Sequence, residues 1–286
     1  MFDVIIIGAG PAGVTASLYA KRANLKILVI YYQETSLQNA EKIENYYGFE
    51  DGIAGKELYL SGIRQAQNLG VEIKKEEVIK IEKEENRFRV TTTNNVHESK
   101  AVILATGSQK NKPNIQGINQ FEGKGISYCA ICDGFFYRNK IVAVLGNGNY
   151  AISEVNDLLN IVHQIKILTN GEPAPEFRAD NVEINTKPVK EIKGDTRVEE
   201  IQFTDNTKLK VDGVFIAQGV ANSSDFAKKL GLLLKKDAIV VNENMETNVA
   251  GVYACGDCTG GTYQIAKAVY EGMKAGLTVI QYLRRG

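Results

Sequence analysis

Histidine and proline are scarce in this sequence of 286 residues. There are two histidines, His97 and His163, far apart along the chain, and five prolines. So few histidines argue against a metal site built from several of them, and against a Ser–His–Asp catalytic triad. Few prolines beside 27 glycines indicate tight turns and close approaches of the backbone to a ligand, and do not indicate disorder.

Excess charge and long apolar runs are also missing. The 34 basic residues are balanced by 34 acidic ones, so the charge gives no case for nucleic-acid binding. No apolar run approaches the ~18 residues of a membrane helix, and the first residues show no basic, cleavable leader. We therefore expect a cytoplasmic protein that binds neither nucleic acid nor a membrane.

The four cysteines form two C-x-x-C pairs, Cys129 with Cys132 and Cys255 with Cys258. In a reducing compartment this spacing is more often catalytic or metal-binding than structural. A zinc site needs four ligands, and the two pairs lie much farther apart than the ~15–20 residues of a zinc ribbon. The pattern therefore favours thiol redox chemistry, for which Asp133, directly after the first pair, is a candidate proton donor or acceptor.

A glycine-rich motif follows the first strand predicted from the sequence. The apolar residues 4–7 run into a G-x-G-x-x-G sequence at 8–13, a helical pattern follows at 14–21, and a second strand is expected at 26–31. With a length of 286 residues favouring two domains, this strand–helix–strand unit is the context in which the motif binds a dinucleotide.

Each glycine of this motif has a separate physical role. Gly8 permits the tight turn, Gly10 lets the backbone approach a pyrophosphate, and Gly13 lets helix and strand pack closely. Pro11 suits the first turn of a helix, where no hydrogen bond is lost. The acidic residue expected ~20 residues later for the ribose is absent from the strand end, and Glu34 follows slightly beyond it.

The same arrangement is repeated in the middle of the chain. A strand at 140–145 leads into a G-x-G-x-x-A sequence at 146–151, then a helix at 152–161 and a strand at 165–168. The sequence therefore predicts two dinucleotide-type folds in one chain. Other expected elements are alternating strands at 72–81 and 87–91, a buried strand at 101–105, and strands at 182–184, 214–217, 238–241 and 251–254. A linker is expected at 111–113 and a helix at 264–283.

Several stretches together resemble one family, the low-molecular-weight thioredoxin reductases, over nearly the whole chain. The block Ser-Tyr-Cys-Ala-Ile-Cys-Asp-Gly at 127–134 is the most specific of them. The other matching stretches are residues 8–13, 43–49, 105–107, 146–151, 247–253, Gly256-Asp257 and Gln264.

The resemblance implies an α/β fold of two Rossmann-like, three-layer domains, with the second inserted in the first. Residues 1–112 and 220–286 would form an FAD domain, and residues 113–219 a nicotinamide-type domain that carries the redox disulfide. It also implies a homodimer. Electrons would pass from FAD to the disulfide, and the resulting dithiol would reduce thioredoxin.

The resemblance further assigns roles to residues. Cys132 would face the flavin, Cys129 would attack the partner disulfide and Asp133 would be the acid. Asp257 would hydrogen-bond the ribityl chain, while Gln264 and Ile265 would lie beside the flavin ring. The full set of expected FAD-binding residues is Gly8, Gly10, Pro11, Ala12, Gly13, Asn45, Thr106, Gly107, Gly256, Asp257, Gln264 and Ile265.

The nicotinamide subsite departs from the NADPH-dependent members of the family. Where those have a basic cluster for the 2′-phosphate, this chain reads Leu-Thr-Asn-Gly-Glu-Pro at 168–173 and has no arginine before Arg178. Thr169 supplies no acidic group for a free ribose either. Asn147 and Tyr150 replace small residues of the glycine loop, where a tyrosine is expected to clash with a pyrophosphate, and the stretch 219–222 lacks the family's proline.

These changes resemble the ferredoxin-dependent flavin thioredoxin reductases, which implies reduced ferredoxin as a one-electron donor to FAD. Ferredoxins are acidic, so a basic docking surface is expected. Its candidates are Lys110, Lys112, Arg138, Lys140, Arg284 and Arg285.

Alternatives remain at this point. NADPH or NADH can still be the donor through an unfamiliar subsite, the substrate can be another disulfide protein, or the chain can be a redox sensor without turnover. Cys255 and Cys258 are either a second redox pair near the flavin or small buried hydrophobic residues, and the second interpretation is favoured because the first pair already supplies the redox chemistry.

Overall fold

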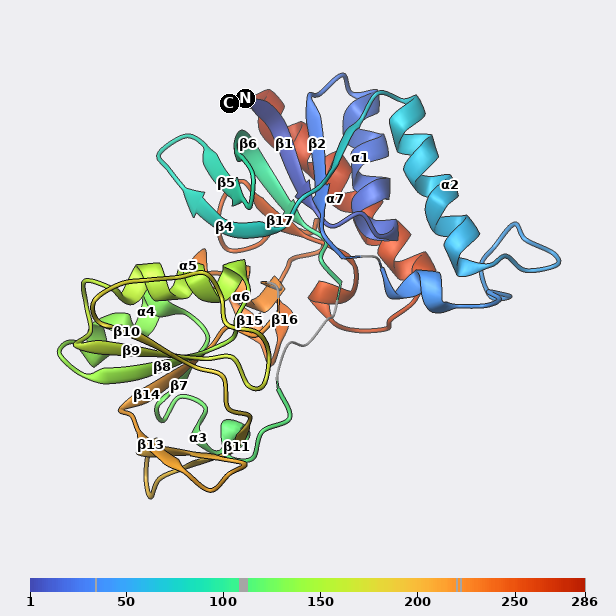
Figure 1. Cartoon of the computed structure of the whole chain (residues 1–286). Coiled ribbons are helices and arrows are strands. Elements are labelled where there is room, and N and C mark those ends of the chain that lie inside the picture. Colours follow the sequence, from blue (N-terminus) through green and yellow to red (C-terminus); the bar gives the residue numbers. More distant parts are fainter. Residues whose placement is uncertain (34, 108–112, 220, 222, 286) are drawn as a thin grey trace. The chain divides into compact units, whose positions relative to one another are not determined.

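The computed structural model describes residues 1–33, 35–107, 113–219, 221 and 223–285. The chain splits into two compact units (Figure 1). Unit 1 combines Met1–Gln109 with Asn222–Gly286, and unit 2 is Lys110–Ala221. Unit 1 is therefore assembled from both ends of the sequence.

The core of unit 1 is a parallel sheet in the order β3-β2-β1-β6-β17. Its strands are β1 (Phe2–Ile7), β2 (Ile27–Tyr31), β3 (Glu72–Lys75), β6 (Val96–Leu104) and β17 (Val252–Ala254). The central strands are continuous apolar runs, as is typical of parallel strands that are covered on both faces.

An antiparallel meander continues from the first half of β6. It consists of β5 (Phe88–Thr92) and β4 (Val78–Lys83). The prediction of one alternating strand over 72–81 is wrong, because β3 and β4 lie at opposite ends of the strand order β3-β2-β1-β6-β5-β4. The chain leaves the parallel strands at Glu76, whose buried carboxylate accepts hydrogen bonds from Thr92 Oγ1 at 2.7 Å and Asn95 Nδ2 at 2.9 Å.

Helices α1 (Pro11–Arg22) and α7 (Ile265–Arg285) pack along one another, with α2 (Gly55–Asn68) next to α1 (Figure 1). Small residues bring the backbones of α1 and α7 together: a Cβ atom on Gly272 would lie 2.2 Å from the carbonyl oxygen of Ala12. Within the described residues, no helix has the length and apolar character needed to cross a bilayer. The remaining elements of unit 1 are η1 (Ser36–Asn39), α6 (Ser223–Lys229), β15 (Leu234–Lys235), β16 (Ala238–Ile239) and η3 (Gly256–Thr259).

Unit 2 has its own parallel sheet, in the order β10-β9-β8-β14-β7. These strands are Val182–Asn185, Gln164–Leu168, Ile141–Leu145, Gly213–Ile216 and Ile126–Ser127. Helix α5 (Asn149–Leu158) connects β8 to β9, as in a dinucleotide-binding fold. The expected α/β class with two Rossmann-like units is therefore confirmed.

A three-stranded antiparallel sheet and several short helical segments complete unit 2. The sheet was not predicted from the sequence, because its strands are short and only partly apolar. These elements are β11 (Val189–Lys193), β12 (Glu200–Phe203), β13 (Lys208–Lys210), α3 (Ile118–Phe121), α4 (Ala130–Asp133) and η2 (Gly134–Tyr137).

We predict that Gly272→Ala destabilises unit 1 by about 1–3 kcal/mol, because the new methyl group forces α7 away from α1. The matched control is Gly62→Ala in α2, where the new methyl group meets Val14 Cγ1 at an ordinary 3.5 Å. This control is expected to stabilise the unit by about 0.5–1 kcal/mol through helix propensity. Denaturant unfolding of both variants checks the prediction, and a shift of both midpoints in the same direction would contradict it.

Candidate functional site

The carboxyl ends of three adjacent strands bring most of the predicted cofactor residues to one edge of the unit 1 sheet. Leu104, at the end of β6, pairs with Ile7 of β1 on one side and Ala254 of β17 on the other. Gly8 follows β1, Thr106 follows β6 and Gly256 follows β17. Ligands of open α/β sheets bind at this edge of the strands.

Gly8 and Gly13 of the first glycine motif are required by close backbone contacts. Gly8 has φ +113°, and a Cβ atom there would lie 2.2 Å from the carbonyl oxygen of Ala105. A Cβ atom on Gly13 would lie 2.0 Å from the carbonyl oxygen of Gly8. Gly10 is different, because a Cβ atom would meet only Thr35 Oγ1, at 3.8 Å. The turn is therefore fixed by its contact with the end of β6, and the backbone at Gly10 stays accessible to a ligand.

The start of α1 is suited to an anion. Gly10 is its N-cap residue, no side chain caps it, Pro11 stands at its first position, and its first turn contains no acidic residue. The N–H groups and the partial positive charge of a helix N-terminus bind phosphate groups in this situation. Glu34, the acidic residue considered for the ribose, lies outside the described residues.

Gly256 and Asp257 form a turn beside the start of α1. Gly256 has φ +81°, and a Cβ atom there would lie 2.8 Å from the Cβ atom of Ala12. The carboxylate of Asp257 is half-buried, and none of the described residues donates a hydrogen bond to it. Burial raises the pKa of Asp257, an effect that Lys267 opposes and Glu271 strengthens. Such a carboxylate is a ready acceptor for a ligand hydroxyl group.

A hydrogen bond joins two further predicted residues that are 219 positions apart. Asn45 Nδ2 donates to Gln264 Oε1 at 3.1 Å, and both side chains are exposed. Gln264 precedes Ile265, the first residue of α7. Together with the glycine cradle and Asp257, this arrangement fits a dinucleotide such as FAD, which these residues would hold by its pyrophosphate, ribityl and flavin parts.

The first cysteine pair lies in unit 2 as a disulfide between Cys129 and Cys132. Cys129 is the N-cap residue of α4, and the backbone N–H of Cys132 donates to its Sγ at 3.2 Å. Such a hydrogen bond favours the thiolate form of a cysteine once the disulfide is reduced. Cys129 is 2% exposed, whereas Cys132 is exposed.

Two polar residues that the sequence analysis gave no role support this pair. Ser127 Oγ donates to Asp133 Oδ2 at 2.7 Å and accepts a hydrogen bond from the backbone N–H of Cys129 at 3.1 Å. Glu154, which is fully buried on α5, accepts a hydrogen bond from the backbone N–H of Ala130 at 2.7 Å. Ser127 lies in the family-specific block, but no sequence signal connects Glu154 to the cysteines.

The second glycine loop repeats the backbone geometry of the first. A Cβ atom on Gly146 would lie 2.1 Å from the carbonyl oxygen of Ala217, and Gly148 is the N-cap residue of α5. The expected clash of Tyr150 with a pyrophosphate is not what the structure shows. Its side chain is 1% exposed in the core of unit 2, and its hydroxyl donates to the carbonyl oxygen of Tyr128 at 3.3 Å.

The segment after β9 bonds to itself and to the glycine loop. Thr169 is buried, and its hydroxyl donates to the carbonyl oxygen of Glu172. Asn147 Nδ2 donates to the carbonyl oxygen of Pro173 at 3.3 Å. In a nicotinamide-binding domain, the adenosine ribose lies between these two segments. The asparagine therefore bridges the place where the ribose and its 2′-phosphate would be recognised.

The basic residues expected to form a docking surface are divided between the two units. Lys110 and Lys112 lie outside the described residues. The Arg138 guanidinium stands 4.8 Å from the Phe135 ring centroid in unit 2. Arg284 and Arg285 end α7, which at ~1.5 Å per residue places them about 28 Å from Ile265. These last two therefore lie far from the residues expected beside the flavin.

Cys255 and Cys258 are free thiols, and both are buried. Burial raises the pKa of Cys258 to about 12 and that of Cys255 well above its ordinary value. Cys258 Sγ donates to the carbonyl oxygen of Cys255 at 3.2 Å. These observations favour their interpretation as small buried hydrophobic residues.

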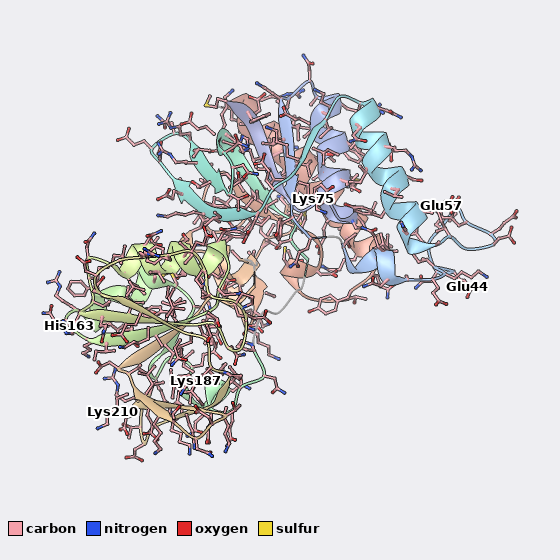
Figure 2. All side chains as sticks on the ribbon, in the orientation of Figure 1. Glu44, Glu57, Lys75, His163, Lys187 and Lys210 are labelled. Atoms are coloured by element: carbon pink, nitrogen blue, oxygen red, sulfur yellow. A yellow bond between two sulfur atoms is a disulfide. The ribbon has the colours of Figure 1, made fainter. Side chains whose placement is uncertain are left out.

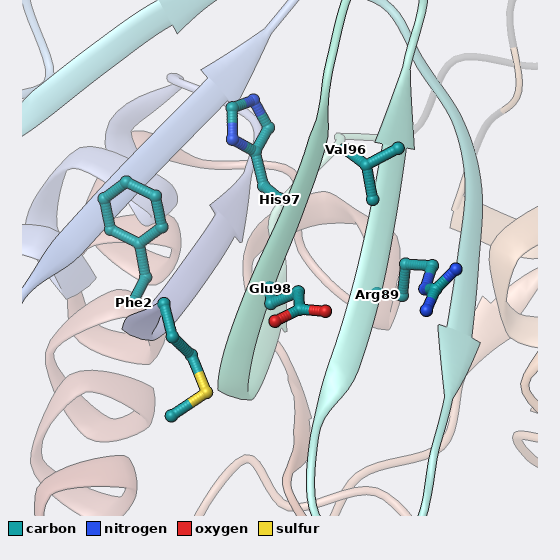
Figure 3. Close-up of a pocket in the computed structure, with 6 residues that line it drawn as sticks. Phe2, Arg89, Val96, His97 and Glu98 are labelled. Atoms are coloured by element: carbon teal, nitrogen blue, oxygen red, sulfur yellow. The ribbon is translucent and has the colours of Figure 1, made fainter.

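Histidine and acidic residues elsewhere do not suggest a metal centre. His163 is exposed on unit 2 (Figure 2), while His97 belongs to unit 1. Among the described residues, no group of three or more His, Cys, Asp or Glu side chains is arranged to hold a metal ion. A pocket on the meander (Figure 3) is lined by Phe2, Arg89, Val96, His97 and Glu98 with Met1, and includes none of the predicted cofactor residues.

Known proteins share this architecture over the full chain. The profile of the pyridine nucleotide-disulphide oxidoreductase family matches residues 2–272. Thioredoxin reductase from Ureaplasma parvum is 35% identical over 100% of this chain and 98% of its own length, and that from Aquifex aeolicus is 36% identical over 99% and 94%.

Two solved structures are similar over 100% of this chain and 99% of their own. The atypical thioredoxin reductase TRi from Desulfovibrio vulgaris Hildenborough has a TM-score of 0.93 at 35% identity. A ferredoxin-flavin thioredoxin reductase from Clostridium acetobutylicum has a TM-score of 0.72 at 34% identity.

The burial of the second cysteine pair predicts selective alkylation. In the reduced native protein, iodoacetamide should modify the exposed Cys132 and leave the buried Cys255 and Cys258 unmodified from pH 7 to pH 10. Only the thiolate reacts, and a raised pKa keeps these two thiols protonated throughout that range. Peptide mass spectrometry measures the modification, with protein unfolded in urea as the control in which all four react. Modification of Cys258 in the native protein at the rate of Cys132 would contradict the prediction.

Proposed function

Because the chain belongs to the pyridine nucleotide-disulphide oxidoreductase family, and within it to the low-molecular-weight thioredoxin reductases, we propose that it reduces thioredoxin with electrons from reduced ferredoxin. Its relatives are FAD-binding flavoproteins, and the residues around Gly8 and Asp257 fit that cofactor. The disulfide between Cys129 and Cys132 is the observation that carries the proposed reductase activity.

The hydrogen bonds around this disulfide support separate roles for its two cysteines. FAD, when bound, supplies the electron pair that converts the disulfide to two thiols. The Cys129 thiolate, which the N–H of Cys132 stabilises, then attacks one sulfur of the thioredoxin disulfide and releases the other as a thiolate. Cys132 resolves the mixed disulfide, so that one dithiol and one disulfide exchange. Asp133, held by Ser127, supplies the proton to the departing thiolate.

Exposed apolar side chains beside the disulfide support a protein substrate. Ile131 is 50% exposed, and Phe135 and Phe136 are 64% and 70% exposed on η2. Apolar groups that are exposed together mark sites of protein association. We propose that thioredoxin docks here, and that attack requires Cys129, which is buried in this structure, to become accessible.

Three features of unit 2 support ferredoxin over a nicotinamide nucleotide as the donor. The segment 168–173 contains no arginine for a 2′-phosphate. The Thr169 hydroxyl is directed to Glu172, and Asn147 is bonded to Pro173 across the ribose position. Two reduced ferredoxins would supply the two electrons required for each disulfide.

We also propose a homodimer, as the family resemblance implies, and a cytoplasmic location, because the free thiols of Cys255 and Cys258 suit a reducing compartment. Sedimentation equilibrium of the purified protein measures the oligomeric state, and fractionation of cells shows the location.

Flavin bleaching with three donors is expected to identify the electron source. Under anaerobic conditions, reduced ferredoxin should bleach the flavin rapidly. Since each charge-assisted hydrogen bond to phosphate contributes about 1.5–3 kcal/mol, their absence predicts bleaching at least about 100-fold slower with NADPH. Stopped-flow absorbance at the oxidised flavin band measures both rates and that of NADH.

Ferredoxin must be freed of excess chemical reductant before mixing, because that reductant can bleach the flavin directly. Oxidised ferredoxin is the control. Rapid bleaching with NADPH would contradict the proposed donor and would identify an NADPH-dependent thioredoxin reductase with an atypical phosphate site. Rapid bleaching with NADH alone would contradict it as well.

Cys129→Ser is expected to separate the two halves of the reaction. The variant should retain flavin bleaching by its donor but lose thioredoxin reduction by at least about 1,000-fold, because the attacking thiolate is gone. An insulin-coupled thioredoxin assay measures turnover. Cys258→Ala is the matched control and should keep turnover close to that of the parent. Turnover by Cys129→Ser at the parental rate would refute the assignment of Cys129.

A further inference from the structure

A largely buried ion pair lies on the first two turns of α7 and contacts the turn that carries Asp257. Lys267 Nζ and Glu271 Oε2 are 3.0 Å apart, four residues apart on one helix face. Their side chains are only 19% and 12% exposed. Neither residue was given a role by the sequence analysis, and neither is among the expected FAD-binding residues.

Both members of the pair bond to the same short turn. Glu271 Oε2 accepts hydrogen bonds from the Gly256 backbone N–H at 2.8 Å and from Thr259 Oγ1 at 2.9 Å. Lys267 Nζ donates to the Gly256 carbonyl oxygen and to Thr259 Oγ1, each at 3.0 Å. The ion pair therefore holds both peptide groups of Gly256 and the end of η3.

The turn is also held by hydrogen bonds of its own, from Thr259 Oγ1 to the Gly256 carbonyl oxygen at 2.7 Å and from the Gly260 N–H to the Asp257 carbonyl oxygen at 3.0 Å. It is a single 3-10 segment of four residues, and it begins with Gly256 in a left-handed conformation that other residues rarely adopt. A Cβ atom at Gly256 would also meet Ala12, so the turn must lie close to the start of α1. The Gly256 carbonyl, which accepts from Lys267, belongs to the peptide group that leads into Asp257.

A buried ion pair is a costly way to stabilise a fold. Desolvation of the two charges cancels much of their attraction, and apolar residues of similar volume often stabilise a protein as well or better. Losing one partner, in contrast, leaves an uncompensated buried charge. Among the described residues, this pair bonds only to the Gly256–Thr259 turn and to itself. The two charged side chains therefore position that turn, which an apolar pair could not do.

We propose that Lys267 and Glu271 are positioning residues for FAD: they hold the Gly256–Thr259 turn in the conformation that presents the Asp257 carboxylate to the ribityl chain. The proposal rests on the FAD site described above. The ion pair itself does not contact the cofactor in this proposal, and it affects FAD affinity through the position of Asp257.

FAD affinity of the apoprotein tests this directly. Lys267→Met removes the charge and keeps the length of the side chain, and it is expected to raise the Kd for FAD by about tenfold, within the range of coupling energies between neighbouring residues. Lys267→Arg should recover part of that loss. Titration of apoprotein with FAD, followed by flavin fluorescence, gives the Kd. Thr259→Val, which removes one shared hydroxyl group, is a milder second variant with a smaller expected rise.

The matched control breaks an exposed ion pair far along the sequence. Lys187, labelled on unit 2 in Figure 2, pairs with Asp205 at 2.7 Å, and both side chains are about half exposed. Lys187→Met should leave the Kd for FAD unchanged. Urea unfolding of each apoprotein shows whether a variant is folded, and Thr259→Val preserves the test if Lys267→Met is not.

A double-mutant cycle separates positioning from simple packing. If Lys267 acts through Asp257, Lys267→Met should change the Kd little once Asp257→Ala is already present. An equal fold-change in both backgrounds, or an unchanged Kd in the folded Lys267→Met and Thr259→Val variants, would overturn the proposal. Failure of the parent protein to bind FAD would instead refute the FAD site itself, so the two failures are distinguishable.

Discussion

The approach of Gly8 to the carbonyl oxygen of Ala105 is the contact on which the candidate cofactor site depends. It joins the ends of β1 and β6, and β17 pairs with β6 on its other side. Any Cβ atom at Gly8 would push the ends of β1 and β6 apart and displace the N-terminus of α1. The same contact recurs between Gly146 and Ala217 in unit 2. The two units therefore share this backbone contact, and different side chains surround it in each of them.

Those side chains give the two units different chemistry. In unit 1 they leave the start of α1 uncapped, and no residue of the described part of the chain donates a hydrogen bond to the carboxylate of Asp257. In unit 2 the equivalent loop carries Asn147, which is bonded to Pro173, while Tyr150 is directed toward Tyr128 near the redox disulfide. In unit 2, the polar groups at the place where a nicotinamide nucleotide would be recognised are bonded to one another. This is why we propose a protein as the electron donor.

Local sequence was sufficient wherever a short segment determines its own structure. The strand–glycine–helix units and the long last helix follow from apolar periodicity and glycine spacing, and the Cys129–Cys132 disulfide was implied by the family resemblance of residues 127–134. The prediction of one strand over 72–81 failed, because four consecutive charged residues at 74–77 interrupt the apolar pattern and the buried Glu76 lies between strands at opposite ends of the strand order. Alternation reports which face is apolar, but not which neighbour a strand will have.

Residue types and their spacing were enough to predict the fold class, the family, the cysteine pair of the redox motif and the glycines that contact backbone. The burial of the Cys255 and Cys258 thiols and the position of Tyr150 in the core became clear from the folded chain. The tertiary structure alone joined Asn45 to Gln264, and Lys267 and Glu271 to the turn at Gly256. The reason is physical: burial and hydrogen bonds between distant residues depend on how the elements pack, and no local pattern of residue types records that packing.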